Sequence, residues 1–333
     1  TFAEVAQPAI TYADGFPLGE YSHRTYKRYE KSGEIVEPTI IKLMKPNGRL
    51  PDPGEIFSQP DLAQTLRTLV DVERFNLHKG RNPALIAVQN EFYRGSIAKE
   101  IVRFHEEHGG LHRMEDYDNF ITKLVPALST NYAGCHIYKH GSWTQGPALL
   151  EMLNILEGYD LKSMGHNSAD YIHVLVEIMK IALADRDHHL GDSDFSAVPI
   201  EGLLSKEYAL ECRGQINMEE ANLAHYLQGD PYLYQKQKLT IKESEELPLD
   251  FKLIYDEGVS GTTCINVVDS LGNMVSATPS GPNGWKTPVM GNTGILMNAR
   301  LGQFIFDKSV NPHNVVEPGK RPRTTLSPTI VLK

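Results

Sequence analysis

The sequence has few cysteines, no long apolar run and fewer basic than acidic residues, and each shortage excludes a class of protein. Its three cysteines, Cys135, Cys212 and Cys264, are widely spaced, so none forms the close pair of a zinc ribbon or a thioredoxin-like site. No run reaches the roughly 18 apolar residues that a membrane-spanning helix needs. The 33 basic residues against 42 acidic ones give a net charge of −9, which argues against a nucleic-acid-binding surface.

The sequence does contain enough apolar material for a folded core, because 41% of its 333 residues are hydrophobic. Helical spacing of these residues predicts helices over 61–75, 90–108, 147–156 and 168–185. A polar stretch, 209–250, also has a helical pattern.

The stretch 168–185 has the clearest helical pattern. Ser168 is placed to cap its first turn. Apolar residues at helical spacing are predicted to form its buried face. They are Ile172, Leu175, Val176, Met179 and either Ala182 or Leu183.

From about residue 258 onward the pattern changes from helices to strands. Residues 262–269 and 274–278 are rich in β-branched residues and flank the turn Leu271–Asn273, which predicts a β-hairpin. A last strand is predicted over 327–332. Helices followed by strands indicate a mixed α/β fold with an antiparallel sheet in the last third of the chain.

The junction Gly261–Thr262 is a candidate for chemistry at the start of the predicted hairpin. A threonine hydroxyl is a weak nucleophile and needs a base nearby. If Thr262 becomes a chain N-terminus, its own α-amine, with an ordinary pKa of about 7.7–8.0, supplies that base. Glycine before it permits a strained peptide bond, and the strand holds the threonine in place. Ordinary strand entry is the alternative, and for these residues alone it is the more common explanation.

Cys264 and the pair His188–His189 also have a chemical and a structural interpretation. Cys264 lies on the same strand face as Thr262 but has no evident histidine partner, so we expect a small buried core residue. His188 and His189 are adjacent, whereas metal-binding histidines on a helix are spaced about one turn apart. A turn with aspartate caps after the helix is therefore favoured over a metal site.

Two loops have interpretations that stay open. The loop Gly141–Pro147 enters a predicted helix and carries Trp143 and two hydroxyl groups, which suits either a ligand pocket or a plain connection. The segment Lys320–Thr325 suits carboxylate binding through arginine forks, and its simpler interpretation is a solvated basic loop.

Several segments, in the same order, resemble the gamma-glutamyltransferase family of N-terminal-nucleophile hydrolases. The resemblance runs from about residue 60 to the end of the sequence. The matching segments are Phe92–Ala98, Gly109–Asp116, Asn154–Glu157, Ala184–Asp192, Thr262–Asn273, Gly294–Asn298 and Lys320–Thr329. The most specific of them, Thr262–Asn273, resembles the segment that opens the family's small subunit.

The resemblance implies an α/β (α+β) fold, a four-layer αββα sandwich, made as one precursor that cleaves itself between Gly261 and Thr262. Residues 1–261 are then expected to be the C-terminal part of the large subunit. Residues 262–333 are expected to be the N-terminal part of the small subunit, and the two form one intertwined domain. Both ends of the precursor are expected to lie outside this sequence, so a periplasmic and a cytoplasmic location both stay open.

The same resemblance implies roles for individual residues. Thr262 is the expected nucleophile, and Ser280 stands where the family keeps a hydroxyl beside the nucleophile's amine. Thr324 and Thr325 stand at the family's paired serines, which bind the glutamyl carboxylate. No metal or other cofactor is implied.

Arg300 and Gln303 depart from the family, which places acidic residues for the substrate's ammonium group in this region. Arg300 repels an ammonium group and favours an anionic acyl group without an amine. The expected function is a self-processing threonine amidohydrolase or acyltransferase of glutathione metabolism, which passes an acyl group from a small-molecule amide to water or an amine. The alternatives are a family member that acts on a non-glutamyl amide, similar to a cephalosporin acylase or an oxamate amidohydrolase, and an inactive ligand-binding relative.

Overall fold

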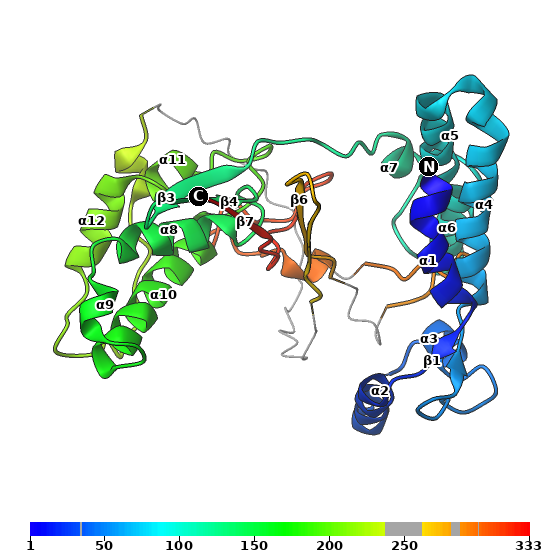
Figure 1. Cartoon of the computed structure of the whole chain (residues 1–333), viewed down its shortest axis with the longest axis horizontal. Helices are drawn as coiled ribbons and strands as arrows, with labels where there is room; N and C mark the ends of the chain where they lie inside the picture. Colours follow the sequence, from blue (N-terminus) through cyan, green and yellow to red (C-terminus); the bar gives the residue numbers. More distant parts are fainter. Residues whose placement is uncertain (34, 237–261, 281–286, 299) are drawn as a thin grey trace. The chain divides into compact units, whose positions relative to one another are not determined.

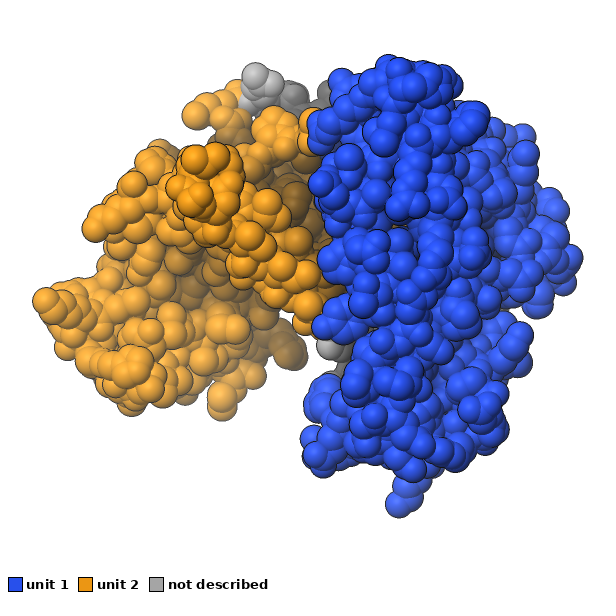
Figure 2. Space-filling view, turned by 45° about the vertical axis from the view of Figure 1, so that its right-hand side comes forward, with its two compact units in different colours: residues 1–123, 281–299 blue, residues 124–280, 300–333 orange. Residues whose placement is uncertain are grey.

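A computed structural model describes residues 1–33, 35–236, 262–280, 287–298 and 300–333, with the helices and strands labelled in Figure 1. The chain forms two compact units, each built from separate stretches of sequence (Figure 2). Unit 1 comprises Thr1–Lys123 and Gly281–Ala299, and unit 2 comprises Leu124–Ser280 and Arg300–Lys333. Among the described residues, no helix is long and apolar enough to cross a membrane.

Unit 1 is mostly helical. Its helices are α1 (Phe2–Asp14), α2 (Glu20–Ser32), α3 (Pro38–Met44), α4 (Pro60–Asn76), α5 (Arg81–Arg94), α6 (Ser96–Glu107) and α7 (Met114–Asp118), with the 3-10 turn η1 (Leu77–Lys79). Strands β1 (Phe16–Pro17) and β2 (Ile56–Phe57) form a short antiparallel pair. One core lies where α4, α5 and α6 meet, around Leu69, Val88 and Ile101.

The helix predicted over 61–75 is confirmed by α4, but the single helix predicted over 90–108 is wrong. The chain breaks at Gly95 into α5 and α6. The Ser96 N–H donates to Glu91 Oε1 at 2.9 Å, so a carboxylate fills the first turn of α6. A side chain at residue 95 would collide with Glu91, so this close turn requires glycine.

The segment 287–298 follows the hairpin in sequence but packs in unit 1. Thr65 Oγ1 donates to Thr293 O at 2.8 Å. Gly294 has a φ of +70°, and a side chain there would collide with the Leu62 backbone. The segment Gly294–Asn298, which resembles a motif of the family, therefore contributes to the packing of unit 1.

Unit 2 combines a three-stranded antiparallel sheet with a group of helices. Strands β3 (Leu128–Tyr132), β4 (Cys135–Lys139) and β7 (Thr329–Leu332) lie in the order β3-β4-β7, and β5 (Ile265–Val268) pairs with β6 (Met274–Ala277). The helices are α8 (Gly146–Leu156), α9 (Leu161–Met164), α10 (Ala169–His189), α11 (Ile200–Leu203) and α12 (Lys206–Gly214), with the 3-10 turns η2 (Pro231–Tyr234) and η3 (Arg300–Gln303). The predicted hairpin, the last strand, the helix over 147–156 and the antiparallel pairing are confirmed.

The helix predicted over 168–185 is confirmed as α10, and Ser168 Oγ caps it by accepting the Tyr171 N–H at 3.1 Å. The predicted buried face is wrong for Ile172, Val176 and Met179, which are 51%, 45% and 48% exposed, but it is confirmed for Ala182, and Leu175 packs against the core. The buried apolar residues are Val174, Ile178, Ile181 and Ala182. Apolar residues lie on both sides of this helix, so their spacing does not decide which side packs against α8.

The helix predicted from the pattern of 209–250 is wrong for most of the part that the structure describes. α12 ends at Gly214, and 215–236 is mainly loop. The side chains of Asn217 and Asn222 each accept a backbone N–H from two residues further on, at 3.0 and 2.9 Å. Such turns compete with helix formation. The rest of the stretch lies outside the described residues.

A cluster of buried polar groups lies where α8, α10 and α12 meet. Tyr208 Oη donates to Asp185 Oδ2 at 2.5 Å, and the Gly229 N–H donates to Asp185 Oδ1 at 2.8 Å. The Glu151 carboxyl, the Asp185 carboxyl and the Cys212 thiol lie within 4.8 Å of one another. Burial, together with the Asp185 charge, raises the pKa of Glu151 well above its ordinary value. Because both Asp185 oxygens already accept hydrogen bonds, we interpret Glu151 as the acid that stays protonated in the folded protein.

Replacing Glu151 by glutamine is expected to stabilise the full-length protein relative to wild type, by an amount that grows as pH rises from about 5 to 8. The folded protein keeps Glu151 protonated, whereas the unfolded chain releases that proton near about pH 4.3, so wild type loses stability above that pH. Glutamine keeps the shape and an N–H donor but does not titrate. Urea denaturation at several pH values measures the difference, with Glu207→Gln on the exposed side of α12 as the control. A stability difference that stays constant with pH would contradict a protonated Glu151 in the folded protein.

Candidate active site

The hairpin of β5 and β6 positions the two residues predicted to carry out catalysis. Ile265 pairs with Ala277, and the Thr263 N–H donates to Pro279 O at 3.2 Å, which extends the pairing beyond the strands. As a result, Thr262 Oγ1 lies 3.1 Å from Ser280 Oγ, within hydrogen-bond distance. Thr262 is exposed, so its hydroxyl is accessible at the open end of the hairpin. Its predicted cleavage partner, Gly261, lies outside the described residues.

The turn of the hairpin fixes the register that brings these two hydroxyls together. Asp269 accepts hydrogen bonds from Asn273 Nδ2 at 2.7 Å, from the Asn273 N–H at 2.8 Å and from the Leu271 N–H at 2.9 Å. These hydrogen bonds lower the pKa of Asp269, and the bond from the Asn273 side chain has the largest effect. Gly272 adopts a φ of +82°, which favours glycine. The Asp-x-x-Gly-Asn part of the motif therefore builds the turn.

The expectation of a buried Cys264 is wrong. Cys264 is exposed, and Asn266 Nδ2 lies 3.5 Å from its sulfur. All residues of β5 are exposed within the part of the chain that the structure describes. A residue can therefore share the strand face of Thr262 without packing in a core.

The loop Gly141–Pro147 holds the segment that contains the predicted carboxylate-binding pair. The Thr324 N–H donates to Trp143 O at 2.8 Å, and Gln145 Nε2 donates to Thr325 O at 3.0 Å. Thr324 is buried and its Oγ1 lies 3.4 Å from Trp143 O, whereas Thr325 is exposed. Of the two hydroxyls, that of Thr325 is the more accessible.

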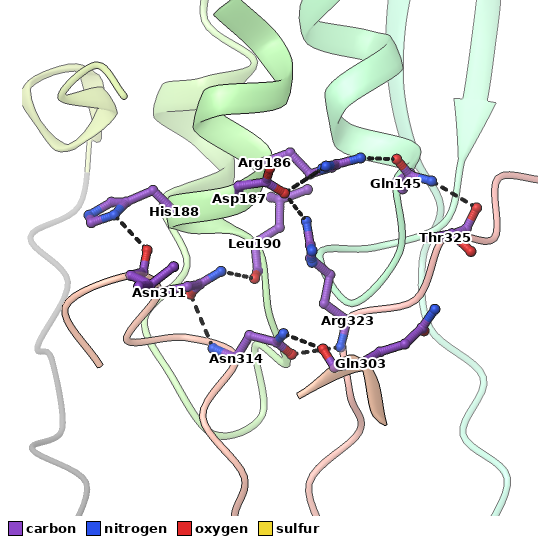
Figure 3. A network of polar contacts seen from close by, with 11 residues as sticks. Gln145, Arg186, Asp187, His188, Leu190, Gln303, Asn311, Asn314, Arg323 and Thr325 are labelled. Carbon is purple, nitrogen blue, oxygen red and sulfur yellow. Dashed lines mark hydrogen bonds and ion pairs between the residues drawn. The ribbon is translucent and has the colours of Figure 1, made fainter. Parts of the chain in front are cut away.

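The end of α10 contributes a charged group to the same place, as Figure 3 shows. Asp187 Oδ1 accepts hydrogen bonds from Arg186 Nε at 2.8 Å and from Arg323 Nη1 at 2.6 Å. Arg186 Nη1 in turn donates to Gln145 Oε1 at 2.6 Å. Two arginines therefore share one carboxylate beside the backbone of Thr325.

Arg300 and Gln303, both on η3, lie next to this group. Asn314 Nδ2 donates to Gln303 O at 2.8 Å, and the Arg323 N–H donates to Asn314 Oδ1 at 2.8 Å (Figure 3). In the amide orientation that satisfies both of its polar atoms, Gln303 donates to Arg323 O at 3.2 Å and accepts from Arg300 Nη1 at 3.0 Å. The four residues predicted to bind substrate, Arg300, Gln303, Thr324 and Thr325, thus belong to one region of unit 2.

Among the described residues, no hydrogen bond joins Thr262 directly to Thr325, and strand β7 provides the connection between the two groups. Lys139 Nζ donates to Ser327 O at 2.7 Å and to Thr329 Oγ1 at 2.6 Å, while the Thr329 N–H donates to Ser276 Oγ on β6 at 3.1 Å. Burial lowers the pKa of Lys139 to about 8.

The simpler interpretation of the basic segment Lys320–Thr325, a solvated loop, is wrong. Arg321 donates from Nη2 to Asp192 Oδ1 at 2.6 Å and to Asp194 Oδ2 at 2.9 Å, and its guanidinium lies 5.1 Å from the Trp143 ring. Asp192 is 1% exposed. Burial acts to raise its pKa, but the bonds from Arg321 outweigh this effect and lower it. Arg321 therefore anchors the segment.

The sequence indicated the Gly141–Pro147 loop and the Ala184–Asp192 segment, but it did not single out Gln145, Arg186 or Lys139 as parts of the site. Each has a partner far along the chain, and side-chain pairing at such separations leaves no local pattern. His188 and His189 were predicted to lie in a turn that follows the helix. They lie instead inside α10, at its C-terminal end. His188 Nδ1 is 3.0 Å from Val310 O.

Comparison with known proteins gives the same family as the motifs. The family model described as gamma-glutamyltranspeptidase matches residues 1–333. A glutathione hydrolase proenzyme of Pseudomonas sp. is 30% identical over the whole chain and 53% of its own length, and a glutathione hydrolase-like YwrD proenzyme of Bacillus subtilis is 31% identical over the whole chain and 55% of its own length. An acylase ACY 1 proenzyme, also of Pseudomonas sp., is 29% identical over 99% of the chain and 52% of its own length. The chain thus spans about half the length of these curated relatives.

Solved structures bear out the predicted fold class. A cephalosporin acylase from Bacillus halodurans superimposes with a TM-score of 0.75 and 26% identity, over 99% of this chain and 56% of that one. A gamma-glutamyltranspeptidase from Pseudomonas nitroreducens gives a TM-score of 0.55 and 27% identity, over 68% of this chain and 63% of that one. The chain belongs to the gamma-glutamyltranspeptidase family and has the mixed helix-and-sheet fold of its N-terminal-nucleophile hydrolases.

Proposed function

We propose that the full-length protein is a self-processing threonine amidohydrolase or acyltransferase, with the acyl-enzyme formed on Thr262. The observation that carries this proposal is the contact between the Thr262 and Ser280 hydroxyls, 3.1 Å apart at the exposed end of the hairpin. The names of the relatives described above as proenzymes agree with maturation by cleavage.

The proposed processing step uses the same hydroxyl as catalysis. Thr262 Oγ1 attacks the carbonyl carbon of Gly261, and the peptide C–N bond breaks as an ester forms. Water hydrolyses that ester and leaves a carboxylate on Gly261 and a free α-amine on Thr262. In the mature enzyme this amine accepts the hydroxyl proton while Thr262 attacks a substrate amide. The leaving amine takes the proton, and water or an amine acceptor then receives the acyl group.

The two proposed pieces, 1–261 and 262–333, are expected to stay together after cleavage. The second piece contributes 262–280 and 300–333 to unit 2 and 281–299 to unit 1. Because each unit contains residues of both pieces, separating the pieces would disrupt both units. This arrangement supports the proposal of one intertwined domain.

We propose that the acyl group carries a carboxylate and no ammonium group. Beside Thr325, the guanidinium groups of Arg186 and Arg323 share the single carboxylate of Asp187. Asp187 already pairs with both of these arginines, so it is poorly placed to bind a substrate ammonium. The excess positive charge attracts an anionic group. This argument favours the acylase-like alternative over a gamma-glutamyl substrate.

Two anilide substrates that differ only in an ammonium group test this proposal. Gamma-glutamyl 4-nitroanilide carries the α-ammonium, and glutaryl 4-nitroanilide lacks it. With the purified full-length enzyme, we expect kcat/KM for the glutaryl compound to be at least about tenfold higher, and the piece that begins at Thr262 to gain the mass of a glutaryl group. Preference for the gamma-glutamyl compound would overturn the substrate class alone. Acylation by neither would favour an inactive relative.

A further inference from the structure

Gln145 connects three parts of unit 2 that lie far apart in sequence. Its N–H donates to Leu326 O at 3.2 Å, and its Nε2 donates to Thr325 O at 3.0 Å. Its Oε1 accepts a hydrogen bond from Arg186 Nη1 at 2.6 Å, so the amide lies between the arginine and the substrate-binding segment (Figure 3). One side chain therefore uses its donor and its acceptor on different partners, which fixes its orientation.

The Arg186 guanidinium is held in place but still has hydrogen-bonding capacity. Its side chain is 20% exposed. Nε donates to Asp187 Oδ1 and Nη1 donates to Gln145 Oε1, while Nη2 forms an ion pair with Asp187 Oδ1 at 2.7 Å. Two hydrogen bonds and this ion pair do not use all five N–H groups of the guanidinium, so among the described residues it keeps donors for a further acceptor.

Thr325 offers a complementary group on the other side of Gln145. Thr325 is exposed, and its carbonyl oxygen, held by Gln145, fixes the backbone that carries its hydroxyl. A carboxylate is bound well by a guanidinium and a hydroxyl together, because it accepts several hydrogen bonds at once.

We propose that Gln145 is a positioning residue that sets the selectivity for acyl groups ending in a carboxylate. Its two hydrogen bonds fix the position of the Arg186 guanidinium relative to Thr325. This inference rests on the proposed function of the site. Because the Thr262–Ser280 pair lies on the separate β5–β6 hairpin, Gln145 is expected to act on the KM for anionic substrates much more than on kcat.

The first test replaces Gln145 by glutamate, which has almost the same shape. Glutamate still accepts from Arg186, but it cannot donate to Thr325 O and it adds a negative charge. We expect the KM for glutaryl 4-nitroanilide to rise at least about tenfold while kcat falls less than about threefold. The KM for gamma-glutamyl 4-nitroanilide should change less, because its ammonium group is attracted by the added negative charge and offsets the weaker binding of its carboxylate. Gln215→Glu, which adds the same charge at the exposed end of α12, is the control and should leave both values unchanged.

A double-mutant cycle on the full-length enzyme separates positioning from a general loss of structure. Gln145→Ala and Arg186→Ala should each raise the KM for the glutaryl compound, and the combined variant should raise it by far less than the product of the two effects. The inference would be overturned if the two single effects on KM multiplied in the combined variant, or if Gln145→Glu left the KM unchanged. Glutaryl acylation of Thr262 in wild type, measured in the same series, reports on the proposed function separately.

Discussion

Replacing Thr262 by alanine is expected to leave the full-length precursor as a single chain and to lower kcat for amide hydrolysis by at least about 1,000-fold. Alanine removes the one oxygen that forms the ester in processing and the acyl-enzyme in catalysis. It also leaves the hairpin intact, because the pairing of β5 with β6 begins three residues later, at Ile265. Gel analysis, intact mass and hydrolysis of the 4-nitroanilides measure both effects.

Two further variants show whether the effect belongs to the Thr262 hydroxyl. Thr263→Ala removes the neighbouring hydroxyl but keeps the backbone bond to Pro279, so it should mature normally. Thr262→Ser keeps a hydroxyl and should still cleave. If Thr262→Ala still cleaved after Gly261, the assignment of the nucleophile would be wrong.

Combining Arg300→Asp with Gln303→Asp is expected to move the enzyme's preference towards gamma-glutamyl 4-nitroanilide by about 100-fold relative to glutaryl 4-nitroanilide. The change replaces one positive and one neutral group by two carboxylates beside Arg323. At about 4 Å, a pair of opposite charges near a protein surface interacts by several kcal/mol at most, which makes a change of this size reasonable. The ratio of kcat/KM for the two anilides measures it.

The control for this pair makes the same change of charge elsewhere in unit 2. Lys162 and Gln215 are both exposed, so Lys162→Asp with Gln215→Asp alters the net charge equally without touching the region around Thr325. It should leave the ratio unchanged. If the Arg300 and Gln303 variant gave no improvement for the gamma-glutamyl compound, our account of charge at that site would be wrong.

Local sequence signals predicted much of the secondary structure. The cap at Ser168 and the turn at Gly272 are set by residues that lie within a few positions of one another, so the starting points of α10 and the hairpin could be read directly. The buried side of α10 could not, because its apolar residues surround the helix. Its packing partner, α8, decides which of them are covered.

The site was predictable only in part. The resemblance to a family supplied Thr262, Ser280 and the region around Thr325, while the Gly141–Pro147 loop stayed open between a pocket and a connection. The structure adds the hydrogen bonds of Gln145 to Thr325 and Arg186, which lie 180 and 41 positions away. No local pattern encodes such contacts, because they depend on how separate elements pack.

The most direct test of the central claim is intact mass combined with N-terminal sequencing of the purified full-length protein. We predict two polypeptides that elute together, the second of which begins Thr262-Thr263-Cys264. A single uncleaved polypeptide, or a second one that begins at another residue, would contradict the claim that Thr262 becomes the N-terminal nucleophile.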